Sequence, residues 1–160
     1  MKRKLINVAI VVVLGSTTAL MAESMGKMEL IKKAQKEVGE ISAKKLNSLL
    51  DEDEDVIVLD VRESEQRAEG SIPSNDMNKE QFISITRGNL EWKVNRLIQD
   101  KEVIIVTYCR NGGRGALAAQ VLKKMGYENA TTLKSGLKGW AKAGYPVKTG
   151  LGNLTLNQEK

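Results

Sequence analysis

The sequence predicts an α/β fold in which helices cover both faces of a parallel β-sheet. Short apolar, β-branched runs alternate with amphipathic stretches along the chain of 160 residues. The run over residues 56–61 is almost continuously apolar and ends in charge, which is typical of a strand buried on both faces. Strands that alternate with helices favour a parallel sheet, and the chain is long enough for one domain with a sizeable core.

The first half of the domain contains signals for three strands and two helices. Residues 38–41 are predicted as a short strand, and Ser42 is a suitable N-cap for a helix that runs to Leu50. The acidic residues 51–55 lack the glycine and the spaced ligands of a cation-binding loop, so we interpret them as a solvated turn. The remaining elements of this half are the strand over residues 56–61, a short helix over residues 63–69 and a strand over residues 82–85.

The second half continues the alternation of helix and strand. Asn89 is a candidate N-cap for a helix whose apolar side carries Leu90 and Val94. The helix over residues 115–125 is expected to bury four large apolar side chains, namely Leu117, Val121, Leu122 and Met125. The other elements are strands over residues 103–107 and 130–133 and a last short helix over residues 137–143.

The first 37 residues differ in composition from the rest of the chain. Residues 1–22 combine a basic start, a short apolar stretch and small residues, which is the pattern of a secretory signal peptide. We therefore expect export to the periplasm, cleavage of this peptide and no stable membrane association afterwards. Residues 23–37 are rich in lysine, and we interpret them as an N-terminal extension outside the core. Within it, Met28, Ile31 and Ala34 share one face of an expected short helix.

The domain itself spans residues 38–147, and residues 148–160 are predicted to be a loosely ordered polar tail. The formal net charge is +5, and removal of the signal peptide with its three basic residues lowers it to +2. Because no basic cluster is interleaved with aromatic residues, nucleic acid is not an expected partner. We expect a monomer that acts on small molecules.

The cysteine of this chain is its most informative residue. Cys109 follows the strand predicted over residues 103–107 and opens the loop Cys109-Arg110-Asn111-Gly112-Gly113-Arg114. The start of the next helix and the two arginines both favour thiolate over thiol. A loop rich in glycine can also turn several backbone N–H groups toward one anion. We therefore interpret Cys109 as an ionised nucleophile that meets an anionic substrate.

Residue types that are absent from the sequence narrow the chemistry. The chain has no histidine, which excludes a histidine general base, a Ser-His-Asp triad and histidine metal ligands. A single cysteine cannot form an internal disulfide, and an unpaired cysteine in an exported protein indicates a reactive thiol. We expect neither a metal ion nor a cofactor.

Four segments follow one another in an informative order. They are Asp60-Val61-Arg62-Glu63, Gly70-Ser71-Ile72-Pro73, the segment from Tyr108 to Arg114, and Gly136-Leu137-Lys138-Gly139-Trp140. Together they resemble the single-domain rhodanese, or thiosulfate sulfurtransferase, family over residues 38–147. Short exported bacterial sulfurtransferases are the most similar type. The resemblance implies a five-stranded parallel sheet with helices on both faces.

The resemblance also implies a reaction. Cys109 would accept sulfane sulfur from thiosulfate or another donor as a persulfide and pass it to a thiol or to cyanide. Six-residue loops like this one, from Cys109 to Arg114, go with sulfur transfer, whereas related phosphatases have a seven-residue loop. Arg114 is placed to bind the donor oxyanion, with Arg110 and Arg67 as further candidates. The candidates for holding the persulfide are loop amides, including those of Asn111, Gly112 and Gly113.

Other residues of the four segments are expected to support the site rather than to react. Asp60 and Arg62 would organise the loops at the strand end through ion pairing and hydrogen bonds, and Trp140 would pack in the core. The family usually has histidine at the position of Ser71. Because that histidine is mainly structural in the family, its replacement bears on local geometry more than on chemistry.

Two other functions remain open at this point. A thiol-based arsenate reductase or phosphatase would use the same anion-binding loop, but a phosphatase also needs a general acid, and the loop contains no carboxylate. A non-catalytic periplasmic sulfur carrier would hold a persulfide on Cys109 as its final state.

Overall fold

The computed structural model describes residues 25–52 and 54–156, and the expected signal peptide lies outside them. A five-stranded sheet with the order β1-β5-β4-β2-β3 forms the centre, and every strand pairing in it is parallel, as predicted. The strands are β1 Glu40–Ile41, β2 Val56–Asp60, β3 Phe82–Ser84, β4 Ile104–Tyr108 and β5 Ala130–Leu133. Since β2 and β4 are parallel neighbours, Asp60 and Tyr108 lie side by side at their carboxyl ends.

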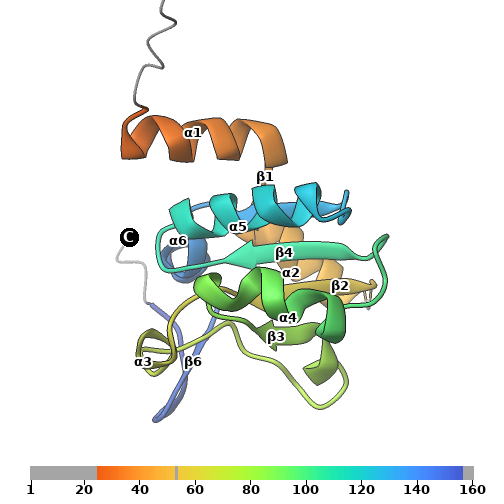
Figure 1. Ribbon diagram of the computed structural model, residues 1–160. Helices are drawn as coiled ribbons and strands as arrows, with labels where there is room; N and C mark the ends of the chain where they lie inside the picture. The colour runs from red at the N-terminus through yellow and green to blue at the C-terminus, as the bar shows by residue number, and fades with distance from the viewer. Residues whose placement is uncertain (1–24, 53, 157–160) are drawn as a thin grey trace, which may run out of the picture.

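Helices cover both faces of this sheet (Figure 1). The helices α4 (Leu90–Leu97) and α5 (Gly113–Lys124) bury their apolar sides on one face. The helices α2 (Ala43–Asp51) and α6 (Gly136–Lys142) do so on the other face. The sequence therefore predicted the layers correctly, including the cap of α2, where the Ser42 hydroxyl accepts a hydrogen bond of 3.1 Å from the Lys45 amide.

Short helical segments fill the connections around β3. The helix α3 (Ser64–Arg67) follows β2, and the 3₁₀ turns η1 (Lys79–Gln81) and η2 (Arg87–Asn89) flank β3. Asn89 precedes α4 as predicted, but its side chain makes no capping hydrogen bond. The preceding turn η2 leads directly into α4, so the chain enters this helix without a side-chain cap.

The N-terminal extension, which we expected to lie outside the core, forms a helix that packs on it through a few residues. Helix α1 (Lys27–Val38) lies along the outer side of α5 (Figure 1). Ala34 and Val38 are buried, and Val38 joins the cluster formed by α4, α5 and the sheet. On the surface, the Gln120 side chain donates a hydrogen bond of 2.6 Å to Glu37.

The position of α1 also explains which residues of α5 are buried. Because α5 is covered by the sheet on one side and by α1 on the other, small side chains allow both layers to approach. Ala116, Ala118 and Ala119 are fully buried. Of the four large residues predicted to be buried, Leu122 is buried, whereas Leu117, Val121 and Met125 are only half-buried.

The polar tail contains ordered structure, which corrects the expectation for residues 148–160 over their described part. Strands β6 (Val147–Thr149) and β7 (Gly152–Leu154) form an antiparallel hairpin. Two backbone hydrogen bonds of 2.9 and 2.8 Å join Ser71 to Lys148. The predicted packing role of Trp140 is confirmed, because its ring is buried and its Nε1 donates to the Pro146 carbonyl at 2.8 Å.

Candidate active site

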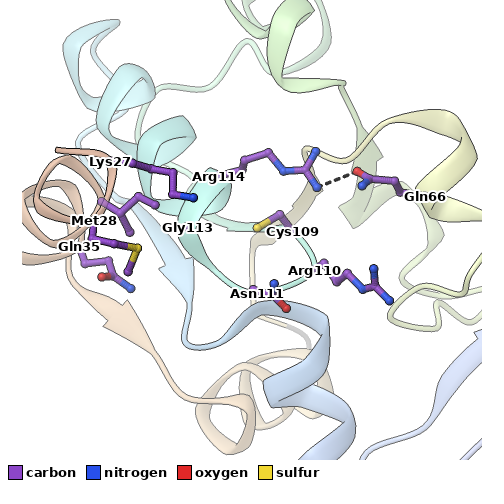
Figure 2. Close-up of a pocket in the computed structure, with 10 residues that line it drawn as sticks. Lys27, Met28, Gln35, Gln66, Cys109, Arg110, Asn111, Gly113 and Arg114 are labelled. Atoms are coloured by element: carbon purple, nitrogen blue, oxygen red, sulfur yellow. Dashed lines mark hydrogen bonds between the residues drawn. The ribbon is translucent and has the colours of Figure 1, made fainter.

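Cys109 directly follows the carboxyl end of the central strand β4, shortly before α5 begins. Its side chain is almost fully buried, and yet it lines an open pocket of about 570 Å³ (Figure 2). Gly112 turns the chain into α5 with a φ of +93°, a conformation that favours glycine. The loop residues Arg110 and Asn111 and the first residues of α5, Gly113 and Arg114, complete this side of the pocket.

The backbone of the loop is held from behind by α6. The amide of Leu137 donates to the carbonyl of Cys109 at 2.8 Å, and the amide of Lys138 donates to the carbonyl of Arg110 at 3.1 Å. These two carbonyls are therefore directed at α6. Close approach is possible because Gly136 has no side chain, and a Cβ there would overlap the Cys109 carbonyl oxygen.

The backbone N–H groups of residues 110–115, which we call the anion cradle, are the groups that the sequence predicts to bind an anion. Within residues 25–52 and 54–156, the amides of Arg110, Asn111 and Gly112 donate to no protein acceptor. The amides in the first turn of α5 have no acceptor within their own helix. With the positive end of the helix dipole behind them, these groups favour an anion beside Cys109.

The side chains around the pocket add positive charge. Lys27, Arg110 and Arg114 line it, and no carboxylate of the described residues does. Arg110 is half-exposed and forms an ion pair with Glu69 at 3.4 Å, outside the pocket lining. The pocket as a whole is therefore suited to negatively charged ligands.

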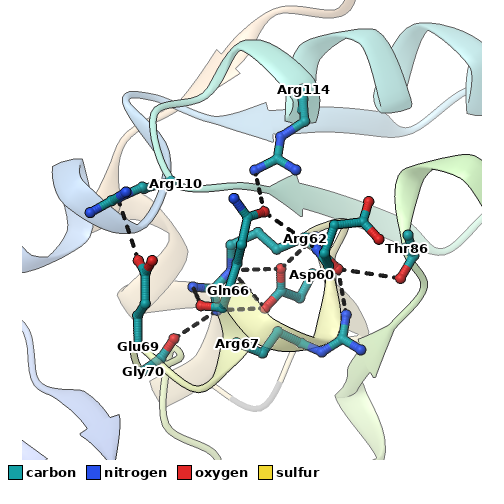
Figure 3. Close-up of polar contacts among 10 residues, drawn as sticks. Asp60, Arg62, Gln66, Arg67, Glu69, Gly70, Thr86, Arg110 and Arg114 are labelled. Carbon is teal, nitrogen blue, oxygen red and sulfur yellow. Dashed lines mark hydrogen bonds and ion pairs between the residues drawn. The ribbon is translucent and has the colours of Figure 1, made fainter.

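Arg114 is fixed by a residue that the sequence analysis did not identify. Its Nη2 donates to Oε1 of Gln66 at 2.7 Å, across the pocket from α5 to α3 (Figure 3). Gln66 is the N3 residue of α3, and it forms a capping box with Glu63. The capping-box spacing from Glu63 to Gln66 was visible in the sequence, but it indicates a helix start and not a contact with Arg114.

The structure does not bring Arg67 to the pocket. This candidate substrate ligand donates from its Nη1 to the backbone carbonyl of Arg62. The interaction joins the end of α3 to the segment after β2 (Figure 3). Arg67 is absent from the pocket lining, so the role in substrate binding that we expected for it stays a prediction.

Beneath α3, Asp60 and Arg62 form a buried ion pair. The Arg62 Nη2 donates to Asp60 Oδ2 at 2.7 Å, and its Nε donates to Oδ1 at 3.0 Å. The guanidinium also donates to the carbonyls of Gln66 at 3.0 Å and Gly70 at 2.7 Å. This pair therefore ties the end of β2 to α3 and to the Gly70 turn, which is the organising role predicted for it.

The surroundings of Arg62 and Tyr108 fix the protonation states of both side chains. Burial by itself lowers the pKa of Arg62, but the hydrogen bonds and the charge of Asp60 outweigh it, so the pKa is raised and the guanidinium stays charged. Burial, followed by the charge of Asp60, raises the pKa of the Tyr108 phenol, which therefore stays neutral. The Arg62 guanidinium also lies 5.4 Å from the centre of the Tyr108 ring.

Comparison with known proteins identifies the family. The family model of the rhodanese-like domain matches residues 42–143. The chain belongs to the rhodanese-like family. A protein named sulfurtransferase from Allochromatium vinosum is 31% identical over 110 residues, which cover 69% of this chain and 94% of the relative.

Solved structures share the rhodanese-like fold. A polysulfide-sulfur transferase homodimer from Wolinella succinogenes is 25% identical with a TM-score of 0.61, over 81% of this chain and 87% of that one. A protein of unknown function from Rhodopseudomonas palustris, described as a possible tyrosine phosphatase, is 25% identical with a TM-score of 0.67, over 78% and 95%. Together with the family match, the relatives named for sulfur transfer support a sulfurtransferase role.

Ser71, which stands where the family usually has histidine, contributes to the structure through its backbone. Ser71 joins the β6 strand through its backbone amide and carbonyl, both bonded to Lys148. Any residue except proline can make these bonds, so the hairpin does not depend on a particular side chain at this position. Ser71 is also not among the residues that line the rhodanese pocket.

Four pocket residues of this rhodanese-like domain come from α1, and sequence reasoning missed all of them as site residues. They are Lys27, Met28, Ile31 and Gln35. Their spacing is helical, but nothing in the sequence indicates that this helix crosses the start of α5.

Among the described residues, no group of three or more potential ligands could hold a metal ion, and no helix has the length and apolar character to span a membrane.

Proposed function

We propose that this rhodanese-like protein is a thiosulfate sulfurtransferase in which Cys109 carries the transferred sulfur as a persulfide. The main support is the pocket itself, because Cys109 lines it together with Lys27, Arg110 and Arg114, and because amides of the anion cradle have no protein acceptor among the described residues. Thiosulfate, sulfite and a persulfide are all anions. Because none of the described residues that line the pocket is a carboxylate, the pocket suits each of these anions.

The first half-reaction loads the enzyme. The Cys109 thiolate attacks the outer, sulfane sulfur of thiosulfate, and a new S–S bond forms. The S–S bond of thiosulfate breaks, and its electron pair leaves with sulfite. Arg114 binds the sulfonate oxygens of the donor with its planar guanidinium. The cradle amides hold the terminal sulfur of the Cys109 persulfide.

The second half-reaction removes the terminal sulfur from the Cys109 persulfide. A nucleophilic acceptor such as cyanide attacks the terminal sulfur of the persulfide. The S–S bond breaks, its electron pair returns to the Cys109 sulfur, and thiocyanate leaves. No proton has to move in either half-reaction if Cys109 and the acceptor are both ionised, so the chemistry needs no histidine.

The fold by itself is compatible with a phosphatase or an arsenate reductase. Cleavage of a phosphate ester requires a general acid to protonate the alkoxide that leaves. Among the described residues that line the pocket, none is a carboxylic acid. In the two half-reactions the leaving groups are sulfite and the Cys109 thiolate, and both are stable anions that need no protonation, so the pocket lining favours sulfur transfer.

We also propose that the protein works outside the cytoplasm, after removal of residues 1–22. The support is the basic, apolar and small-residue order of this segment. The mature chain would begin near Glu23, and α1 would then start soon after the new N-terminus.

Thiocyanate formation tests the reaction. The mature protein is incubated with thiosulfate and cyanide, and Cys109→Ser serves as the matched variant. We expect turnover in the first and none in the second, because Cys109 is the only thiol of the chain. Parallel assays with p-nitrophenyl phosphate and with arsenate test the alternatives. Activity that survives in Cys109→Ser, or hydrolysis of the phosphate ester as the only activity, would refute the assignment.

A further inference from the structure

We propose that helix α1 adds a substrate subsite to the active site, in which Lys27 selects a sulfur acceptor that is an organic thiol with its own negative charge. This inference rests on the proposed function and concerns the second half-reaction. It commits to small thiols that carry a carboxylate or a similar anion on a short carbon chain. The subsite consists of Lys27, Met28 and Ile31.

The subsite is firmly attached to the domain. Ala34 and Val38 anchor α1 in the core, and both are buried. At the pocket, the Ile31 side chain packs so closely on Gly113 that a Cβ on this glycine would lie 3.0 Å from Ile31 Cδ1. Gly113 is the first residue of α5 and belongs to the Cys109 loop. The α1 wall is therefore held in contact with the segment that forms the anion cradle.

Lys27 is an available cation. It makes no ion pair and no hydrogen bond within the described part of the chain. It is the first residue of α1, where the positive end of the helix dipole disfavours a lysine. A positive charge in this unfavourable place lines the same pocket as Cys109, on the side away from Gln66 (Figure 2), and adds to the attraction of an anion.

The pocket has room for more than thiosulfate. Its volume of about 570 Å³ falls in the range of roughly 300–1,000 Å³ that is usual for pockets that hold organic ligands. Met28 is exposed and Ile31 half-buried, so the wall offers apolar surface next to a cation. A carbon chain against Met28 and Ile31, with its anion at Lys27, would bring a thiolate toward the sulfur on Cys109.

The transfer step balances without another reactant. The acceptor thiolate attacks the terminal sulfur of the Cys109 persulfide and forms a new S–S bond. The bond between that sulfur and Cys109 breaks, and its electron pair stays on the Cys109 sulfur. The products are the free enzyme thiolate and an organic persulfide anion.

The test measures discharge of the preformed Cys109 persulfide by three thiols of similar size. They are 3-mercaptopropionate, which is anionic, 2-mercaptoethanol, which is neutral, and cysteamine, which is cationic. The quantity compared is the ratio of the rate constants for 3-mercaptopropionate and cysteamine. Because each protein variant meets the same thiols, differences in their intrinsic reactivity cancel when this ratio is compared between variants.

The variants are Lys27→Gln and Lys27→Glu, with Lys32→Gln as a control that removes an exposed charge of α1 outside the pocket lining. We expect Lys27→Gln to lower the ratio about two- to fivefold, the range of an exposed ion pair. Lys27→Glu should lower it further, and Lys32→Gln should leave it unchanged. The neutral thiol should respond least.

Two results would overturn the inference while the proposed function stands. One is a ratio that is the same in both Lys27 variants as in the unmodified protein. The other is an equal change in Lys32→Gln, which would indicate a general effect of net charge. Discharge by cyanide is measured in parallel. If cyanide discharges no persulfide in the unmodified protein, the proposed function fails and this inference fails with it.

Discussion

Replacement of Arg62 by methionine should destabilise the domain by about 3–5 kcal/mol, because it leaves a buried carboxylate without its partner. Asp60 is 2% exposed and Arg62 is 0% exposed. The methionine side chain fills part of the space but donates no hydrogen bond, and only the backbone N–H of residue 62 still donates to Asp60 Oδ1, at 3.0 Å. Asp60 then loses its guanidinium donors at 3.0 and 2.7 Å, and the carbonyls of Gln66 and Gly70 lose theirs as well.

This free energy converts into a large thermal shift. A domain of this size loses roughly 3–4 °C of melting temperature per kcal/mol, so Arg62→Met should lower Tm by about 10–20 °C. The measurement is thermal unfolding followed by circular dichroism, with urea unfolding at 25 °C as a second determination of the free energy.

A second variant separates the stranded charge from the lost contacts. Asp60→Asn in the Arg62→Met background removes the negative charge and should recover part of the loss, since a neutral amide is less costly to bury than an unpaired carboxylate. Arg62→Lys keeps the positive charge but not the planar guanidinium that reaches four acceptors. Its stability should therefore lie between that of the unmodified protein and that of Arg62→Met. A shift below about 3 °C in Arg62→Met, or a double variant less stable than Arg62→Met alone, would refute this account of the pair.

Three further outcomes follow from the site. Arg114→Lys should raise the KM for thiosulfate and Arg114→Ala should raise it more, with stability reduced by no more than about 0.5–1.5 kcal/mol for the single bond to Gln66; an unchanged KM with a large loss of Tm would make Arg114 structural. Gly136→Ala should displace the Cys109 loop and lower turnover, because the added Cβ meets the Cys109 carbonyl. The control Gly88→Ala should keep normal turnover, because Gly88 has open space around it. Equal turnover in both variants would argue against the support of the loop by α6. The N-terminus of the exported protein should be found near Glu23, and full-length chain in the membrane fraction would show an uncleaved anchor.

The sequence was sufficient for elements whose signals are local. Strand β5 was predicted with the bounds that the structure has, and Ser42 caps α2 as expected. The Cys109 loop was placed correctly between a strand and a helix because apolar β-branched residues precede it and two glycines lie within it. Asp60 and Arg62 were assigned their organising role because they belong to the segments that carry the family resemblance and stand at the end of a predicted strand.

The sequence was insufficient where a contact depends on how helices cross. The face of α1 that carries Ile31 and Ala34 was recognised, but its partner α5 was not, because alanines on α5 give no strong amphipathic signal. Gln66 has a clear local function at the start of α3, which concealed its contact with Arg114. The hairpin of β6 and β7 was missed because its strands have three residues each and their sequence is mostly polar.

The most direct test of the central claim is the intact mass of the protein after incubation with thiosulfate. Cys109 is the only residue of the chain that can form a persulfide, so no other site can account for a gain. We predict a gain of one sulfur atom, which cyanide removes and which Cys109→Ser does not show. An unchanged mass under conditions in which thiocyanate is produced would contradict a persulfide on Cys109.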